Sequence, residues 1–147
     1  MKNIIIKDKK QYLILLKKLF DKCDSFKIVV PLNKNFFNLN NNSMPLIIQK
    51  LLPYSTNSEN TSTWPGTKVS RGQKENYRIY TFKICSQTFD IMKKYSNFFD
   101  VKVENEIEYY TSFNEDIQLD ISFFEYNNCI FYTTVHEGIC MIEKELS

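Results

Sequence analysis

Glycine and proline are scarce in this chain: its 147 residues include three Gly and four Pro. Collagen-like, elastic and low-complexity linker proteins are therefore excluded. The glycines, Gly66, Gly72 and Gly138, are also too sparse to form a phosphate-binding glycine loop.

Paired cysteines and clustered histidines are missing as well. None of the four cysteines belongs to a CxxC pair, and His136 is the only histidine, so no standard zinc spacing exists. We expect the thiols to be reduced and partly buried, with a disulfide or a metal site as the alternative. The cysteines are Cys23, Cys85, Cys129 and Cys140.

Long hydrophobic runs are absent too. Residues 1–6 are followed at once by Lys7-Asp8-Lys9-Lys10, which does not resemble a signal peptide. Lysines break the apolar run 13–16, so no segment is predicted to span a bilayer. We expect a cytoplasmic protein without a membrane partner.

Aromatic residues are abundant, at 15% of the chain, with 12 Phe, 9 Tyr and one Trp. Such residues bury large areas and suit β-strands, which predicts an aromatic-rich sheet packed on helices. The length fits a single domain over residues 1–147.

Two helices are predicted. The first runs to Lys22, with Asp8 as its cap, Gln11 completing a capping box, and an apolar stripe at helical spacing. The second begins at Ser86 as a cap and runs through Phe99.

Strands are predicted over 26–32, 76–84, 119–125, 129–136 and 139–143, with a brief one over 101–103. Residues 3–6 fit either a short strand or an entry segment. Pro31 marks the end or edge of its strand. Residues 45–52 fit either a strand or a helical turn, 104–118 are undecided, and 33–42 and 54–73 are predicted loops. The predicted fold is α+β: one antiparallel sheet with two helices on one face, ending in a three-stranded meander.

Catalytic patterns are weak. His136 with Glu137, Cys129 or Cys140 is one candidate site, but a hydrogen-bonded histidine at a turn is the simpler interpretation. Carboxylate pairs are another, since Glu104, Glu106 and Glu108 share a face if that segment is extended. Acidic runs more often form solvated surfaces.

Charge is distributed unevenly along the chain. Residues 1–34 carry a net charge of +6, residues 35–99 carry +5 and residues 100–147 carry −9, within a total of +2. The acidic third suits a basic protein partner, and the basic part suits nucleic acid. A third interpretation is that the parts neutralise each other in the fold. Nucleic acid receives less support, because arginine occurs only at Arg71 and Arg78 and no recognised nucleic-acid module is present.

Trp64 lies beside a Pro-Gly turn in the segment Ser62–Thr67. An exposed tryptophan in a loop could anchor a protein interface, and the alternative is a side chain that folds back to fill the core.

Several short motifs between residues 46 and 143 carry a family resemblance. They are Leu51-Leu52-Pro53, the WPGT core of residues 64–67, the strand 77–82, Phe98-Phe99-Asp100, the segment 120–124 and His136-Glu137-Gly138. In this order they resemble small bacterial proteins, some of which look like immunity proteins of polymorphic toxin systems. Where such proteins often show Trp and Pro after the second helix, this chain has residues 101–105.

The resemblance implies a protein that binds without turnover and occludes a toxin, with no cofactor. The partner is expected to be another protein, such as a basic toxin domain. The alternatives are a phage or mobile-element accessory protein that inhibits a host factor, and a small enzyme using His136. The expected partner-binding residues are Trp64, Glu104, Glu106, Glu108, Tyr109, Tyr110, Glu115, Asp116 and Asp120.

Overall fold

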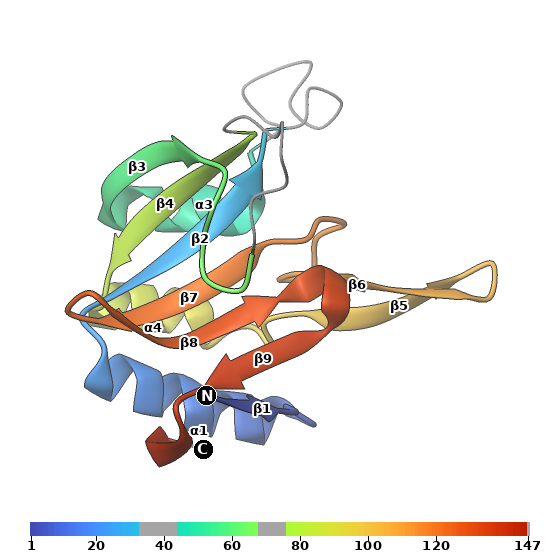
Figure 1. The fold of residues 1–147 in the computed structure, drawn as a ribbon, viewed down its shortest axis with the longest axis horizontal. Coiled ribbons are helices and arrows are strands. Elements are labelled where there is room, and N and C mark those ends of the chain that lie inside the picture. The colour runs from blue at the N-terminus through green and yellow to red at the C-terminus, as the bar shows by residue number, and fades with distance from the viewer. Residues whose placement is uncertain (33–43, 68–75, 147) are drawn as a thin grey trace.

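The computed structural model describes residues 1–32, 44–67 and 76–146. Within these ranges, seven antiparallel strands form one sheet in the order β1-β9-β8-β7-β2-β4-β3. A separate two-stranded ribbon, β5–β6, extends to the right of this sheet (Figure 1). The predicted α+β class, with a large antiparallel sheet and helices on one face, is confirmed.

The sheet consists of β1 (Lys2–Ile4), β2 (Ser25–Pro31), β3 (Ser55–Thr61), β4 (Tyr77–Lys83), β7 (Asp120–Glu125), β8 (Asn128–Thr134) and β9 (Ile139–Ile142). The ribbon is β5 (Asp100–Glu104) and β6 (Ile107–Thr111). The helices are α1 (Lys9–Lys22), α3 (Leu46–Leu51) and α4 (Ser86–Met92), with short 3-10 turns at Leu52–Tyr54, Val135–Glu137 and Lys144–Leu146. Strands β7, β8 and β9 are neighbours in both sequence and space, which confirms the C-terminal meander.

Helix α1 begins as its sequence predicts. The Asp8 carboxylate accepts a hydrogen bond from the Gln11 backbone N–H at 2.9 Å, and the Gln11 side chain accepts one from Lys7 N–H. The first bond satisfies a backbone donor of the first turn, whereas the second involves Lys7, the residue before the cap, and not Asp8 as the predicted capping box requires. The predicted apolar stripe faces inward, with Tyr12, Leu15, Leu16 and Leu19 buried.

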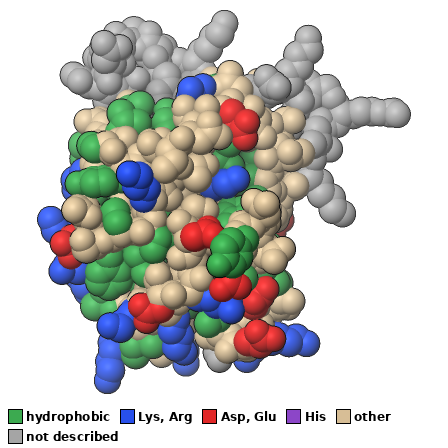
Figure 2. Space-filling model, turned by 90° about the vertical axis from the view of Figure 1, so that its left-hand side faces the viewer, with side chains coloured by type: hydrophobic (Ala, Val, Ile, Leu, Met, Phe, Trp, Pro, Cys, Tyr) green, Lys and Arg blue, Asp and Glu red, His purple; other side chains and the backbone are tan. Residues whose placement is uncertain are grey.

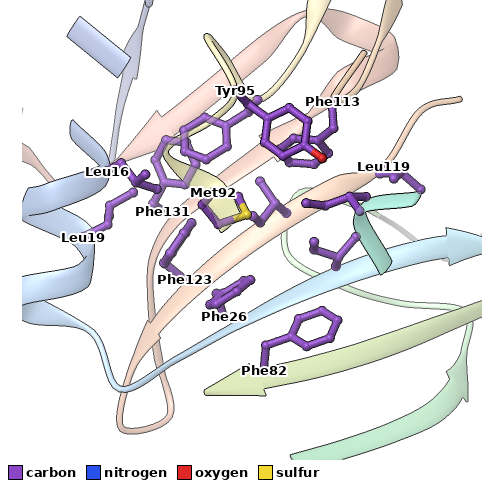
Figure 3. Close-up of a cluster of buried hydrophobic side chains, with 14 of the residues drawn as sticks. Leu16, Leu19, Phe26, Phe82, Met92, Tyr95, Phe113, Leu119, Phe123 and Phe131 are labelled. Carbon is purple, nitrogen blue, oxygen red and sulfur yellow. The ribbon is translucent and has the colours of Figure 1, made fainter. Parts of the chain in front are cut away.

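The core lies between the helices and one face of the sheet (Figure 3). Phenylalanines from four adjacent strands form the sheet side of this core. The ring centroid of Phe26 lies 5.3 Å from those of both Phe82 and Phe123, and Phe123 also contacts Phe131. Phe98 packs above Phe131 at 5.0 Å. Offset and edge-to-face contacts of this kind favour a single arrangement of the rings. The prediction of an aromatic-rich sheet under helices is therefore confirmed.

The predicted loop 54–73 is wrong over residues 55–61, which form strand β3. Its sequence, STNSENT, has none of the apolar alternation expected of a strand. The segment is extended because it pairs with β4 at the sheet edge, with Glu59 opposite Ile79 and Thr61 opposite Tyr77. Backbone hydrogen bonds, rather than side-chain burial, stabilise such an edge strand. Residues 68–75, and the predicted Asn-rich loop 33–42, lie outside the described residues.

The second predicted helix starts near the expected place but ends early. Its N-cap is Cys85 rather than Ser86, and regular helix stops at Met92. The Asn97 side chain accepts a bond from Phe98 N–H and donates one to the Ile6 carbonyl. The chain therefore turns irregularly toward Phe99 while Phe98 stays buried.

The two undecided segments are now assigned. Residues 45–52 include helix α3, whose Ile47, Ile48 and Leu51 join the core. Residues 104–118 contain strand β6 and a series of turns.

The face of the sheet opposite the helices, which we call the open face, is partly covered by residues 62–67. Val29, Ile79 and Asp120 are register partners across β2, β4 and β7, so their side chains emerge together on this face. Gly66 lies against the side chains of Tyr132 and Thr134, where a Cβ would clash, and its φ of 85° is one that glycine adopts readily. Segment 62–67 therefore crosses the sheet closely (Figure 1).

Among the described helices, none is long and apolar enough to cross a membrane.

Candidate functional site

Glu115 serves an internal role. Its carboxylate accepts hydrogen bonds from the backbone N–H groups of Leu46 at 2.7 Å and Ile47 at 3.2 Å. These are the first N–H groups of α3, whose N-cap residue, Pro45, supplies no side-chain bond. A carboxylate there also suits the helix dipole. Glu115 thus caps a helix that lies far away in sequence.

Trp64 and Asp120 meet on the open face. The Trp64 Nε1–H donates to one oxygen of Asp120 at 2.8 Å, and Val135 N–H donates to the other at 2.8 Å. The Trp64 ring also packs on Tyr77, with centroids 4.5 Å apart. Burial raises the pKa of Asp120 above its ordinary value, although these two hydrogen bonds and His136 oppose the shift. Trp64 is half-buried and folds back onto the sheet, but on the open face and not into the core, so neither an exposed anchor nor a core-filling side chain describes it fully.

The β5–β6 ribbon carries the acidic residues 104, 106 and 108. The chain reverses at Asn105 and Glu106, whose φ angles of 51° and 66° are those of a tight turn. Glu104 pairs with Ile107, and Glu108 pairs with Val103. Because side chains alternate along a strand, Glu104 and Glu108 lie on opposite faces of the ribbon. The expectation that all three glutamates share a face is therefore wrong, since it assumed one continuous strand.

The ribbon exposes apolar side chains between these charges. Val101 is 53% exposed, Val103 67% and Ile107 66%. Residues 100–111 contain four carboxylates and one lysine, hence a net charge of −3. In the described part of the chain, β5 and β6 pair only with each other, so each presents an open edge.

Tyr110 fixes the base of the ribbon. Its ring packs edge-on against Phe99 at 5.5 Å and lies so close to Gly138 that a Cβ there would collide with it. Tyr109, on the other face, donates its hydroxyl to Glu104 at 3.3 Å. Tyr110 therefore packs against the body of the protein, whereas Tyr109 lines a surface depression described next.

A groove runs along the open face beside the ribbon and is made of two adjoining cavities, of about 290 and about 330 Å³. We call it the open-face groove. Pro31, Tyr77 and Gln118 line both cavities; the first is completed by Val29, Trp64, Asp120 and His136, and the second by Tyr109, Tyr110, Thr111, Asp116 and Ile117. Six of the lining residues were not expected at a site, namely Val29, Pro31, Tyr77, Thr111, Ile117 and Gln118. The first three belong to predicted strands, whereas Thr111, Ile117 and Gln118 fall in the undecided segment 104–118, so no sequence pattern placed them at a site.

His136 lies on a 3-10 turn with its side chain 62% exposed, and its Nε2 is 3.6 Å from Glu137 Oε1. No hydrogen bond joins it to a cysteine among the described residues. All four cysteines are free. Cys140 is buried, which raises the pKa of its thiol to about 12, and Cys129 bonds the Phe131 carbonyl. A histidine-activated thiolate, which requires such a contact, is not assembled here.

Other charges are dispersed over the surface. Glu125 lies 3.7 Å from Lys22, so one carboxylate of the C-terminal third is paired with the N-terminal helix. On the side that lies at the left of Figure 1, acidic and basic side chains are interspersed among hydrophobic and neutral ones (Figure 2). Of the expected partner-binding carboxylates, Glu115 and Asp120 are held internally, whereas Glu104, Glu106, Glu108 and Asp116 are exposed.

Within the described ranges, no group of three His, Cys, Asp or Glu side chains is arranged to hold a metal ion. Comparisons with models of known protein families, with curated proteins and with solved structures gave no match. The ribbon and the open-face groove are therefore the basis for inferring function.

Proposed function

We propose that this protein is a non-catalytic binding module that docks a basic protein partner through its β5–β6 ribbon. The observation that carries the proposal is the ribbon itself, a projecting pair of strands with exposed Val101, Val103 and Ile107 among four carboxylates. A two-stranded ribbon in water gains little stability from such exposed apolar groups. Binding of a partner that covered these groups would gain the free energy of their burial.

The two kinds of side chain support different parts of binding. Burial of apolar groups supplies affinity, at roughly 25 cal/mol per Å² removed from water. The carboxylates attract a positively charged partner, which speeds association and disfavours acidic competitors. The open edges of β5 and β6 also allow a partner strand to add to the ribbon through backbone hydrogen bonds.

A finer form of the proposal is that the partner is a toxin domain and that the protein acts as its immunity protein. The resemblance of residues 46–143 to such proteins supports it, as does the negative charge of the ribbon, which suits a basic target. The accessory-protein alternative uses the same surface against a host factor, so the identity of the partner separates the two.

The test compares two triple variants of equal charge change. Glu104→Gln/Glu106→Gln/Glu108→Gln neutralises the ribbon, whereas Glu59→Gln/Asp90→Asn/Glu145→Gln neutralises exposed carboxylates elsewhere. Each tagged protein is crosslinked in cells of its native host, and the captured proteins are identified by mass spectrometry. The proposal expects a basic protein captured by the wild type and the control but lost from the ribbon variant. Capture of the same proteins by all three would overturn it.

A second experiment tests the immunity form. The captured partner is expressed alone and together with this chain, and growth is measured. Growth arrest that the wild type relieves and the ribbon variant does not relieve is the expected result. A partner that leaves growth unaffected would overturn the immunity form while leaving the binding proposal intact.

A further inference from the structure

The open-face groove combines aromatic walls with negative charge. Trp64 and Tyr77 pack on each other and line one cavity, and Tyr109 lines the adjoining one, so aromatic side chains border both. Asp120 lines the cavity of about 290 Å³, which we call the inner cavity. Asp116 lines the cavity of about 330 Å³, which we call the outer cavity. Neither Lys nor Arg is among the described residues that line it. A positively charged group would be attracted by both the aromatic rings and the two carboxylates of this described lining.

Thr111 adds an unpartnered polar group beside the outer cavity. The residue is 3% exposed, and its Oγ1 has no hydrogen-bond partner within the described part of the chain. Buried hydroxyls almost always have a partner, because an unpaired one loses its bonds to water without compensation. Thr111 lines the outer cavity but its Oγ1 is closed off from it, so a ligand there supplies the missing bond only when the side chain rotates about χ1.

Asp120 gives a similar indication in the inner cavity. Its two oxygens each accept one bond, from Trp64 and from Val135, although a carboxylate has room for about four. It is partly buried, and among the described residues that line its cavity the only side chain that can carry a positive charge is the exposed His136. The vacant acceptor positions of this carboxylate match a cationic donor.

We propose that the open-face groove binds a guanidinium group, as carried by an arginine side chain. This group is planar and stacks on aromatic rings, it is weakly hydrated, and its five N–H donors spread over a fork. The fork can bond both oxygens of a carboxylate or a carboxylate and a second acceptor, and the groove offers the carboxylates of Asp120 and Asp116, with the hydroxyl of Thr111 beside the latter's cavity. An ammonium group concentrates its donors at one point and is more strongly hydrated. The groove shares Tyr109, Tyr110 and Thr111 with the base of the ribbon, but its lining includes none of the exposed residues Val101, Val103, Glu104, Ile107 and Glu108, so the inference does not depend on the ribbon's role.

The test uses the single tryptophan as a reporter. The full-length protein is titrated with N-acetyl-arginine methylamide, while the Trp64 indole N–H resonance is followed by NMR. The matched citrulline compound is isosteric but neutral, and the matched lysine compound is an ammonium. We expect a saturable shift with the arginine probe, with a dissociation constant on the order of millimolar, weaker binding of the lysine compound and none of the citrulline compound. No saturable shift, or equal binding of the citrulline or lysine compound, would overturn the proposal.

Two variants locate the site. Thr111→Val removes the unpartnered hydroxyl and nearly keeps the shape, so it leaves the melting temperature unchanged or raises it. It should weaken the arginine probe about tenfold, as expected for one lost hydrogen bond to a charged group. Asp116 is exposed, and Asp116→Asn should also weaken binding of the arginine probe. Asp90→Asn on α4 is the control and should leave that binding unchanged. Unchanged affinity in both groove variants would refute the assignment of this groove.

The source of the guanidinium is resolved by comparing an arginine flanked by glycines in a short peptide with free arginine. Tighter binding of the peptide assigns the groove to a protein side chain, and tighter binding of free arginine assigns it to a small molecule. The ribbon variant Glu104→Gln/Glu106→Gln/Glu108→Gln should retain probe binding. A failure of the ribbon proposal therefore leaves this one standing, and the reverse also holds.

Discussion

Removal of the Glu115 carboxylate should destabilise the protein without affecting partner binding. In the structure this side chain accepts hydrogen bonds from Leu46 and Ile47 at the start of α3. Loss of a side-chain cap costs about 0.5–2 kcal/mol, and a hydrogen bond to a charged group contributes about 1.5–3 kcal/mol. Because Glu115 is only half-buried, we expect Glu115→Ala to lower the free energy of unfolding by about 2 kcal/mol, at the upper end of the cap range. Glu115→Gln, which keeps one acceptor, should cost about half of that.

The assay is urea denaturation followed by circular dichroism, with thermal melting as a second measure. For a chain of this size, a loss of about 2 kcal/mol lowers the melting temperature by about 6 °C. The neighbouring Asp116→Asn is the matched control, because the same turn loses a charge that caps no helix. If Glu115→Ala has the same melting temperature as the wild type, or if Asp116→Asn lowers the melting temperature by the same amount, the capping role is refuted.

Three further predictions concern the open face and the thiols. Burial acts to raise the pKa of the Cys85 thiol, but hydrogen bonds with Thr88 and the charge of Lys83 outweigh it and leave that pKa below its ordinary value. Iodoacetamide at neutral pH should therefore modify Cys85 first, and mass spectrometry showing uniform labelling would contradict this. Because the raised pKa of Asp120 makes the folded state bind its proton more tightly, this contribution to stability is present at acid pH and lost as pH rises through that pKa. The free energy of unfolding of the wild type, measured relative to that of Asp120→Asn by urea denaturation, should accordingly fall from acid to neutral pH. The same difference at every pH would count against this prediction. Gly66→Ala should cost about 2 kcal/mol and shift Trp64 emission to longer wavelength, since a Cβ there is strained by a φ of 85° and displaces segment 62–67 from the sheet.

The elements that sequence alone predicted well are those whose signals are local. Helix α1 has its cap and apolar stripe within residues 8–22, and both operate as expected. Strands β2 and β4 and the meander show apolar runs or alternation broken by turns. In such segments the pattern that predicts the element is also the pattern that buries it.

The elements that were missed depend on distant partners. Strand β3 has a polar sequence and is extended only because β4 offers a free edge. The bond from Leu46 to Glu115 spans 69 residues, and that from Trp64 to Asp120 spans 56. Summed charge along the chain therefore could not show which carboxylates reach solvent. The ribbon could not be predicted from the sequence, because it depends on the chain reversal at Asn105 and Glu106 that pairs β5 with β6.

The β5–β6 ribbon has a consequence for how such a protein changes over time. Its exposed residues 101–108 take no part in the packing of the phenylalanine core, and most of their contacts are within the ribbon. If the ribbon docks the partner as proposed, substitutions there alter recognition at little cost in stability, whereas Phe26, Ile28 and Val30 are constrained by the core. Copies of this fold that face different partners should consequently diverge fastest at the ribbon tip while keeping the same sheet.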